Sequence, residues 1–238
     1  MGQIYLIPNL LGDTDAQTVI PSYVIEIIKE LKIFASENPK NTRRFLKKID
    51  KSIDINSITF LELSEHTDIF QTESYLKYLK NGDIGIISEA GCPGIADPGA
   101  DLVNLAHKHN VKVIPLVGPS SILLSLIASG CNGQKFSFNG YLPIKNNERT
   151  RAIKNYERQS YQENRTQIFI ETPYRNKKLF DELIKNLKPE TLLTIACDIT
   201  TSNEYIRTKS VINWKNNFPN IEKRPCIFII YASEFKRK

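Results

Sequence analysis

A glycine- and proline-rich stretch from Ile84 to Gly99 carries the residue types best suited to holding a small ligand. It opens with a short apolar run, which is typical of a buried parallel strand. Gly91, Gly94 and Gly99 then permit backbone conformations and a close ligand approach that other residues resist, while two prolines fix the chain. The sequence therefore predicts a rigid loop after a strand, which is where α/β proteins bind ligands.

Two further loops have the same character. One runs from Pro8 to Asp13 after a predicted strand, and the other runs from Val117 to Ser121 after another. Any one of these loops could be a simple structural turn. Three such loops after three strands instead predict one elongated ligand across the carboxyl edge of a sheet, contacted mainly by backbone groups.

Other kinds of site find little support in the sequence. A GxGxxG dinucleotide fingerprint and a GxxxxGK[ST] phosphate loop are both missing. His66, His107 and His109 lack the spacing of a zinc protease motif, and no Ser-His-Asp arrangement can be argued. The four cysteines are far apart and form no CxxC pair, so we interpret them as free thiols and expect no bound metal.

The elements that must position these loops follow two patterns. In the first half, strands and helices alternate, which indicates a mostly parallel sheet with flanking helices, and in the second half closely spaced strands indicate a mixed sheet with helices. We therefore expect two α/β domains, residues 1–118 and 119–238. Strands are predicted at residues 3–7, 32–35, 58–63, 84–87, 111–116, 136–141, 167–170, 192–196, 204–210 and 226–231, and helices at 21–31, 38–51, 71–80, 102–110, 122–129, 146–159 and 177–187.

Charge and hydropathy limit the partners. The net charge of +6 permits a polyanionic partner without requiring one. Two helices concentrate basic side chains, which either follow RNA phosphates or form an ordinary solvated surface. The candidate RNA-binding residues are Lys40, Arg43, Arg44, Lys47, Lys48, Arg149 and Arg151. No apolar run is long enough to span a bilayer and no basic leader precedes one, so we expect a cytoplasmic protein with no membrane partner.

Five segments, in order and spread over nearly the whole chain, carry a family resemblance. They are Ile4-Tyr5-Leu6-Ile7-Pro8 with Gly12, Ser88-Glu89-Ala90-Gly91-Cys92-Pro93 continuing to Asp97-Pro98-Gly99, Pro115-Leu116-Val117-Gly118-Pro119-Ser120, Phe138-Asn139-Gly140-Tyr141-Leu142-Pro143, and Phe169-Ile170-Glu171-Thr172-Pro173-Tyr174-Arg175. With these segments the chain resembles the tetrapyrrole methylase superfamily of S-adenosylmethionine-dependent methyltransferases. Within that superfamily it most resembles the branch that acts on ribosomal RNA.

The resemblance implies a cofactor, S-adenosyl-L-methionine, folded into a cleft between two α/β domains, and it implies a homodimer. It also implies methylation of ribosomal RNA, in the small ribosomal subunit, at a ribose 2'-hydroxyl. The cofactor contacts that it implies are Leu10, Leu11, Glu89, Ala90, Gly91, Gly118, Pro119, Ser120, Ser121, Glu171, Thr172, Pro173, Tyr174, Ile199 and Thr200. In this comparison, Asp97-Pro98-Gly99 is expected to begin the next helix rather than to contact the cofactor.

Four departures from the pattern of the RNA branch concern substrate and activity more than the cofactor. The usual Glu-Asp-Thr-Arg is Glu37-Asn38 followed by three extra residues, and the usual Asp of the central loop is Glu89. An expected Lys is missing, because the usual Arg-Glu-Leu-Thr-Lys run here ends at Thr201. The usual Lys-Gly-Glu before the last strand is replaced by Lys223-Arg224-Pro225.

The catalytic group is left open by the sequence. Methyl transfer depends mostly on alignment of nucleophile, methyl carbon and leaving sulfur, and a weakly acidic ribose hydroxyl gains from a nearby base or cation. The polar candidates are Glu37, Glu89, Glu171 and Arg175, each of which could instead fix a loop by a hydrogen bond. Two alternative functions remain, methylation of a small tetrapyrrole-like substrate and RNA binding without catalysis by a relative that keeps the cofactor pocket.

Overall fold

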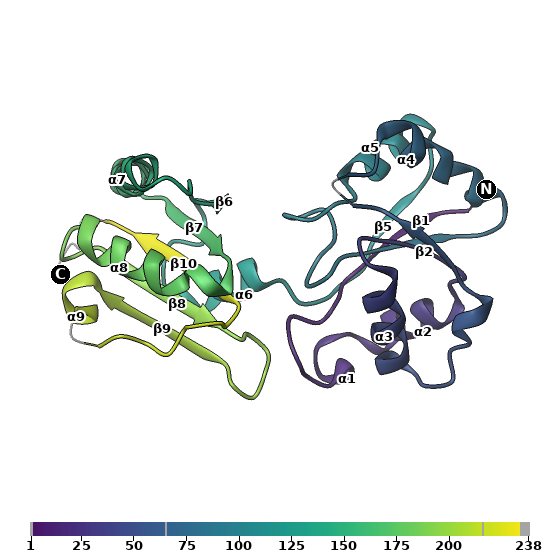
Figure 1. The fold of residues 1–238 in the computed structure, drawn as a ribbon, viewed down its shortest axis with the longest axis horizontal. Coiled ribbons are helices and arrows are strands. Elements are labelled where there is room, and N and C mark those ends of the chain that lie inside the picture. Colours follow the sequence, from purple (N-terminus) through teal and green to yellow (C-terminus); the bar gives the residue numbers. More distant parts are fainter. Residues whose placement is uncertain (1, 65, 216, 234–238) are drawn as a thin grey trace. The chain divides into compact units, whose positions relative to one another are not determined.

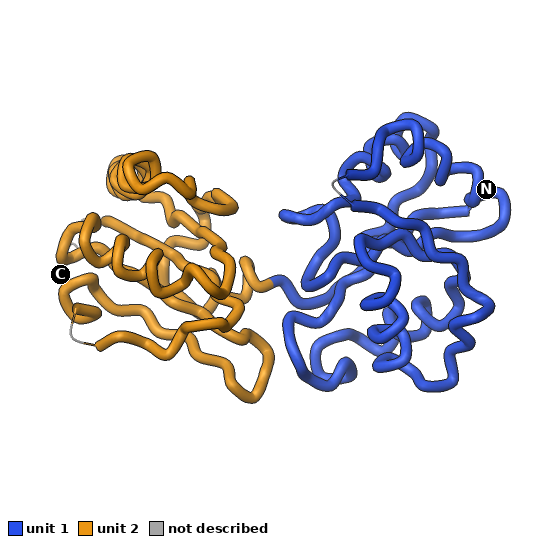
Figure 2. Tube along the Cα trace, viewed as in Figure 1, with its two compact units in different colours: residues 1–120 blue, residues 121–238 orange. Residues whose placement is uncertain are grey.

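The structure is a computed structural model that describes residues 2–64, 66–215 and 217–233. It divides into two compact units, Met1–Ser120 and Ser121–Lys238 (Figure 2). The division follows Ser120, whereas the sequence places a domain boundary after Gly118. Each unit contains one five-stranded sheet and its own buried core, so each is described by itself.

The sheet of the first unit is entirely parallel, with the strand order β3-β2-β4-β1-β5. Each strand is short and its residues are largely apolar, which is typical of strands covered on both faces. Because all five strands run in one direction, the loops that follow them emerge at one edge. The strands are β1 (Ile4–Ile7), β2 (Ile33–Ser36), β3 (Thr59–Glu62), β4 (Ile84–Ile87) and β5 (Val113–Pro115).

Helices cover both faces of this sheet (Figure 1). One core lies under α2 and α3, where Val24, Ile28 and Leu46 are fully buried, and another lies under α4 and α5, where Leu102 and Ala106 are buried. The helices are α1 (Ala16–Val19), α2 (Ser22–Glu30), α3 (Pro39–Ile49), α4 (Ile69–Tyr75) with the 3₁₀ turn Leu76–Lys80, and α5 (Ala100–Lys108), with a 3₁₀ turn at Ile55–Ser57.

The sheet of the second unit is mixed, with the strand order β6-β7-β10-β8-β9. β6 pairs parallel with β7, and the remaining neighbours are antiparallel. The strands are β6 (Phe136–Tyr141), β7 (Thr166–Glu171), β8 (Leu192–Cys197), β9 (Tyr205–Ser210) and β10 (Cys226–Tyr231). One parallel and one mixed sheet confirm the predicted α/β class.

The main core of the second unit lies between the sheet and three helices. Phe169, Leu183, Trp214 and Phe228 are all almost fully buried there. Helix α6 packs against strands β9 and β10. The hydroxyl of Thr208, on β9, donates to the carbonyl of Ser129, at the end of α6, at 2.8 Å. The helices are α6 (Ser121–Ser129), α7 (Asn146–Glu163), the 3₁₀ turn Pro173–Arg175, α8 (Asn176–Asn186) and α9 (Val211–Trp214).

The cysteines of the second unit correct one interpretation of the sequence. Cys197 ends β8 and Cys226 begins β10, and the antiparallel register sets them directly opposite one another. The structure joins them by a disulfide, with the two Cα atoms 4.3 Å apart. Cys92 and Cys131 are free thiols. The sequence does not show the disulfide, because strand pairing brings together two cysteines that lie far apart along the chain.

Apolar segments of the first and second units are short. Within residues 2–64, 66–215 and 217–233, no helix has the length and apolar character needed to cross a membrane.

Candidate active site

The loops after β1 and β4 are joined directly in the first unit. Asn9 and Gly91 form an isolated antiparallel bridge, in which the Asn9 amide donates to the Gly91 carbonyl at 2.8 Å. The Asn9 side-chain amide also donates to the carbonyls of Ser88 at 2.8 Å and Glu89 at 3.1 Å. One asparagine therefore fixes the backbone of the glycine-rich loop beside the loop of β1.

The loop after β5 packs onto the same two loops. A Cβ atom on Gly118 would lie 2.2 Å from the Cβ of Pro8, so only glycine fits without a shift. The Pro119 carbonyl lies 3.6 Å from the Cys92 sulfur, and the same distance from the position of a Cβ on Gly91, whose φ is +70°. The structure thus brings together the three loops that the sequence nominates.

Most of the nominated cofactor residues of the first unit lie on these loops. Leu10 is buried in the core at 7% exposure, so its main chain is the part left for a ligand. Glu89 and Ala90 are exposed at the tip of the glycine-rich loop, and Gly91 behind them is buried. Leu11, Gly118, Pro119 and Ser120 complete the set, whereas Ser121 opens α6 in the second unit.

A cavity of about 560 Å³ beside the first two loops also includes the basic helix α3. Its lining combines Leu11 and Glu89 with Asn41 and Arg44 of α3, and the Asn41 amide donates to the Glu89 carboxylate at 2.5 Å. Four of the predicted cofactor residues, Leu10, Leu11, Glu89 and Ala90, therefore line the same cavity as Arg44, a predicted RNA-binding residue. Lys48 reaches the same cavity, where its ammonium lies 2.6 Å from Asp13 and lowers the pKa of that exposed carboxyl group.

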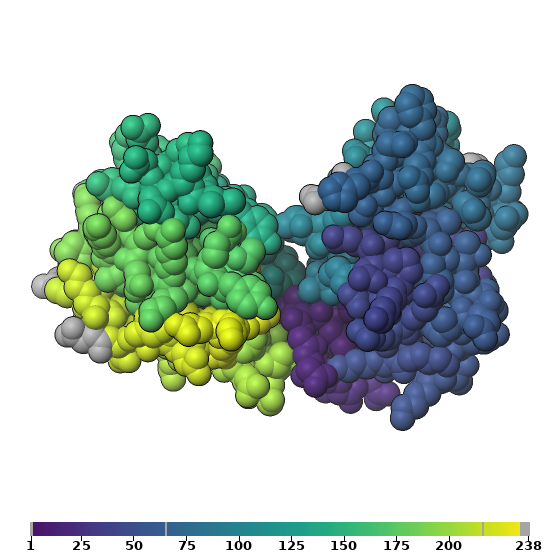
Figure 3. Space-filling model, viewed as in Figure 1, coloured from purple at the N-terminus to yellow at the C-terminus, as the bar shows by residue number. Residues whose placement is uncertain are grey.

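The sequence of α3 explains why its basic residues face outward. The Asn38 side chain caps the helix by accepting from the amides of Lys40 and Asn41, and Pro39 occupies the first turn. Four positions at helical spacing are buried, which turns the others to solvent. The exposed basic residues are Lys40, Arg43, Arg44, Lys47 and Lys48, and the Arg43 guanidinium lies 4.7 Å from the ring centre of Phe60. Figure 3 shows α3 on the visible surface of the first unit.

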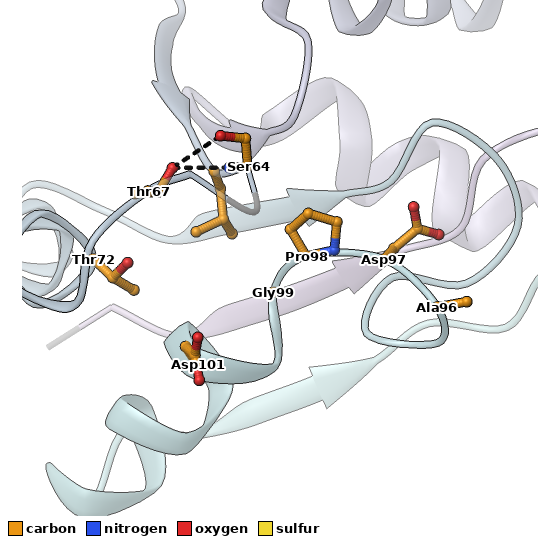
Figure 4. A pocket seen from close by; sticks show the side chains of 9 residues that line it. Ser64, Thr67, Thr72, Ala96, Asp97, Pro98, Gly99 and Asp101 are labelled. Atoms are coloured by element: carbon orange, nitrogen blue, oxygen red, sulfur yellow. Dashed lines mark hydrogen bonds between the residues drawn. The ribbon is translucent and has the colours of Figure 1, made fainter. Parts of the chain in front are cut away.

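Asp97 lies close enough to Glu37 and Glu89, two of the predicted catalytic residues, for their charges to affect it. Asp97 lines a second cavity, of about 400 Å³, together with Ser64, Thr67 and Gly99 (Figure 4). Burial, and then the negative charges of Glu37 and Glu89, raise its pKa to about 6. The sequence expects Asp97 to begin a helix, but α5 starts at Ala100. No signal in the sequence marks Asp97 as a titrating group, because its neighbouring acids come from the ends of β2 and β4.

In the second unit, the buried Glu171 carboxylate and the partly exposed Arg175 form an ion pair at the end of β7. One Glu171 oxygen accepts from the Thr172 amide at 2.7 Å and from the Arg175 guanidinium at 2.6 Å and 2.8 Å. The other Glu171 oxygen, Oε2, is buried and has no hydrogen-bond partner among the described residues. Such an orphaned acceptor is costly unless a ligand satisfies it.

A second orphaned atom lies on the turn after β8. Thr200 has a left-handed backbone, with φ of 71°, and its hydroxyl is buried without a partner in the described part of the chain. The pairing of β10 with both β7 and β8 places this turn at the same sheet edge as Glu171. Arg224 supports the turn by binding Asp198 at 2.6 Å, and Ile199 is buried.

The structure overturns one nominated RNA-binding residue. Arg149 is 1% exposed, because α7 turns it toward α8, where it pairs with Glu182 and donates to Asn146 at 3.0 Å. A guanidinium that is buried and paired in this way cannot reach a phosphate. Arg151, two residues later on α7, is exposed.

Comparison with known proteins adds sequence relatives and structural neighbours. No protein-family model matches the chain. The protein called ribosomal RNA small subunit methyltransferase I of Synechocystis sp. is 30% identical over 205 residues, which cover 86% of this chain and 69% of that protein. The protein of the same name from Buchnera aphidicola subsp. Schizaphis graminum is 29% identical over 243 residues, which cover 100% of this chain and 81% of that protein.

Two solved structures share the fold. The methyltransferase CobJ aligns with a TM-score of 0.63 at 14% identity, over 98% of this chain and 95% of that one. Uroporphyrin III C-methyl transferase from Thermus thermophilus aligns with a TM-score of 0.57 at 15% identity, over 97% and 98%. These two structural neighbours show the fold of the chain, whereas the sequence relatives show its family. By that likeness along nearly its whole length, the chain belongs to the ribosomal RNA small subunit methyltransferase I family.

Proposed function

We propose that this protein transfers a methyl group from S-adenosyl-L-methionine to ribosomal RNA of the small ribosomal subunit, at a ribose 2'-hydroxyl. The observation that carries the proposal is the cavity of the first unit, where the exposed glycine-rich loop meets the basic side of α3. A cofactor loop and a phosphate-binding helix beside one another suit transfer to a polyanion. The names of the sequence relatives agree with that substrate class.

The residues present fit the proposed cofactor. In the first unit, the loops offer the main chain of Leu10, Ala90 and Pro119 around positions where only glycine fits. In the second unit, the orphaned oxygens of Glu171 and Thr200 are hydrogen-bonding groups that lack partners. The full proposed set is Leu10, Leu11, Glu89, Ala90, Gly91, Gly118, Pro119, Ser120, Ser121, Glu171, Thr172, Pro173, Tyr174, Ile199 and Thr200.

Methyl transfer to a hydroxyl requires that the protein align the reacting atoms and provide a proton acceptor. When bound, S-adenosyl-L-methionine supplies an electrophilic methyl group on a sulfonium. The acceptor hydroxyl loses a proton as it attacks, so a carboxylate beside it assists. Glu37 and Glu89 are proposed for this role, and Asp97, with a pKa near neutrality, joins them. Arg175 holds Glu171 in place, which makes both of them positioning residues.

The proposed RNA-binding surface is the exposed face of α3. Lys40, Arg43, Arg44 and Lys47 are directed to solvent, and Arg44 borders the cofactor cavity. Phosphate contacts by such side chains give an affinity that falls steeply with salt. Arg151 of α7 is proposed as a further contact, without Arg149.

Methylation of a small tetrapyrrole is the second candidate, favoured by the fold that the chain shares with a uroporphyrin III methyltransferase. Binding of RNA without catalysis is the third. An RNA substrate would use the exposed basic face of α3 along its phosphate backbone. Charge reversal of Arg43 and Lys47, which do not line the cofactor cavity as Arg44 and Lys48 do, should weaken RNA binding and leave cofactor affinity unchanged.

We also propose that the protein is a cytoplasmic homodimer. The outer side of α6 carries Leu123 at 49% exposure and Ile127 at 78%, apolar side chains that a second copy would cover. Sedimentation of the purified protein tests this, because a monomer at micromolar concentration would contradict the proposal. Cell fractionation tests the compartment.

Transfer of labelled methyl from S-adenosyl-L-methionine to small ribosomal subunits tests the function. The subunits should come from a strain that lacks this protein, so that the acceptor is unmodified. Label in the RNA supports the proposal. Tight cofactor binding without label in RNA favours the tetrapyrrole or the non-catalytic candidate, and loss of cofactor binding by calorimetry removes both enzyme candidates.

A further inference from the structure

An exposed tyrosine stands on the second unit among three lysines. Tyr174 is 82% exposed on the turn between β7 and α8. It lines a cavity of about 470 Å³ with Lys177, Lys178 and Lys223. We call these four residues the tyrosine–lysine surface. An exposed ring next to cationic side chains offers a flat stacking face together with positive charge.

The main chain under this surface is held rigidly from two sides. The Lys223 amide donates to the Pro173 carbonyl at 3.1 Å, which ties residues 221–224 to the turn. Fully buried Asn176 donates its side-chain amide to the carbonyls of Ile221 at 2.9 Å and Arg224 at 2.7 Å. Figure 3 shows α8 and the segment before β10 next to each other on one face of the unit. Tyr174 is therefore presented outward on a fixed platform.

The charges around the ring favour an anionic partner. Lys177 lies 3.6 Å from Glu222, while the ammonium groups of Lys178 and Lys223 make no ion pair with any described residue. Of the acids that line the cavity, Glu182 is paired with Arg149, so Asp181 is the one left without a basic partner among the described residues. Two unpaired lysines beside a ring suit a nucleotide, whose base stacks and whose phosphates contact lysine.

We propose that the tyrosine–lysine surface binds a nucleotide of single-stranded RNA, with a base stacked on Tyr174 and the adjacent phosphates at Lys178 and Lys223. The inference rests on the proposed RNA substrate and adds a second contact region, on a different unit from α3. It also assigns the Tyr174 ring to RNA, whereas the family resemblance assigns this position to the cofactor. The main chain of the turn stays available to the cofactor.

RNA affinity of three tyrosine variants tests the stacking contact. Binding of a short fluorescein-labelled oligouridylate and of isolated small subunits is measured by anisotropy and by sedimentation. Tyr174→Ala should weaken binding by between about 5-fold and about 150-fold, the range of one lost base stack. Tyr174→Phe keeps the ring and should bind as the wild type does. Tyr23→Ala removes a tyrosine that is 49% exposed on α2 and should change nothing.

The lysines are tested by the salt dependence of the same binding. Lys178→Gln with Lys223→Gln should lower the slope of log affinity against log salt by about 2, because each phosphate contact contributes about 1. Lys185→Gln, on α8 outside the surface, is the matched control and should leave the slope unchanged. An unchanged slope in the double variant overturns the phosphate contacts.

Cofactor binding separates the two assignments of Tyr174. If Tyr174→Ala weakens RNA binding by the cofactor-free protein, where loss of a cofactor contact has no effect, the inference stands, whatever affinity for S-adenosyl-L-methionine calorimetry finds. If RNA binding is unchanged, or if cofactor affinity falls and RNA affinity does not, the inference is wrong. If the wild-type protein binds neither RNA probe, the RNA substrate itself fails, which is a separate result from failure of Tyr174.

Discussion

In each unit the candidate site lies at the carboxyl ends of strands, which we call the first edge and the second edge. Different interactions hold the loops at these two edges. In the first unit, main-chain contacts and glycines hold the loops, with one asparagine across them. In the second unit, ion pairs hold the turns, Glu171 with Arg175 and Asp198 with Arg224. The first edge is therefore sensitive to added volume, and the second to removed charge.

The largest expected effect is on the first edge. Gly118→Val places side-chain atoms where the Pro8 ring already lies, at 2.2 Å from the new Cβ, and Pro8 is held by its own ring and by β1. We expect a loss of about 3 kcal/mol in the free energy of unfolding, at the upper end for overpacking. Urea denaturation measures it. Gly133→Ala, with no atom within 4 Å of its Cβ, is the control and should cost less than about 1 kcal/mol.

On the second edge, loss of charge should matter most. Arg175→Met leaves the buried Glu171 carboxylate without its cation, and we expect a loss of about 2 kcal/mol, reduced from a fully buried pair because Arg175 is 32% exposed. Addition of Glu171→Gln should restore part of this stability. A double variant that is no more stable than Arg175→Met would contradict the ion-pair account.

Asn9→Ala tests the side-chain link between the loops after β1 and β4. It removes the hydrogen bonds to Ser88 and Glu89, so the glycine-rich loop loses its fixed position. We expect a cost of about 1 to 2 kcal/mol in stability and about 10-fold weaker binding of S-adenosyl-L-methionine by calorimetry. Asn139→Ala, whose amide bonds lie in the second unit, should leave cofactor contacts of the first unit unchanged. Unchanged affinity in Asn9→Ala would show that backbone contacts alone hold the loop.

The smallest expected effect concerns Asp97, an acidic side chain in the loop after β4. Its pKa rises from 3.8 to about 6 on folding, so the folded state binds the proton more tightly, and stability falls as pH rises through this window. Asp97→Asn removes the penalty and should stabilise the protein at pH 7 by about 1 kcal/mol, after allowance for solvent screening. Thermal unfolding at about pH 2.5 and at pH 7 measures it.

The pH series carries its own check. Below about pH 3 the wild-type carboxyl is mostly protonated in both states, so Asp97→Asn should give almost no gain there. In a Glu37→Gln background the gain at pH 7 should shrink, because Glu37 contributes to the raised pKa. If Asp97→Asn stabilises the protein equally at all pH values, the cause is packing and not charge.

The features predicted correctly from the sequence are those with a local signal. All ten predicted strands exist with small shifts at their ends, and the three glycine-rich loops meet as expected, because apolar runs and Gly–Pro patterns are local signals. The short helices α1 and α9 were missed, since four residues show no periodicity.

Features that depend on pairing across the sheet were not predictable from local pattern. The disulfide of Cys197 and Cys226 depends on antiparallel register. The raised pKa of Asp97 depends on its burial and on nearby acids, of which Glu37 follows another strand, β2. Burial of Arg149 depends on which side of α7 faces α8, and on a helix with few apolar residues the pattern leaves this undecided. In the second unit, the nomination of Glu171 and Thr200 came from family resemblance, because no local pattern marks an orphaned oxygen.

The link between Asn9 and Ser88 has a consequence for how the protein forms. These residues are 79 positions apart, and strands on both sides of β1 come later in the chain. A parallel sheet with such distant pairings must close long loops before its contacts form, which slows folding. The first edge therefore takes shape late, and a chain still emerging from the ribosome without β4 has the residues of the first loop but no partner to hold them.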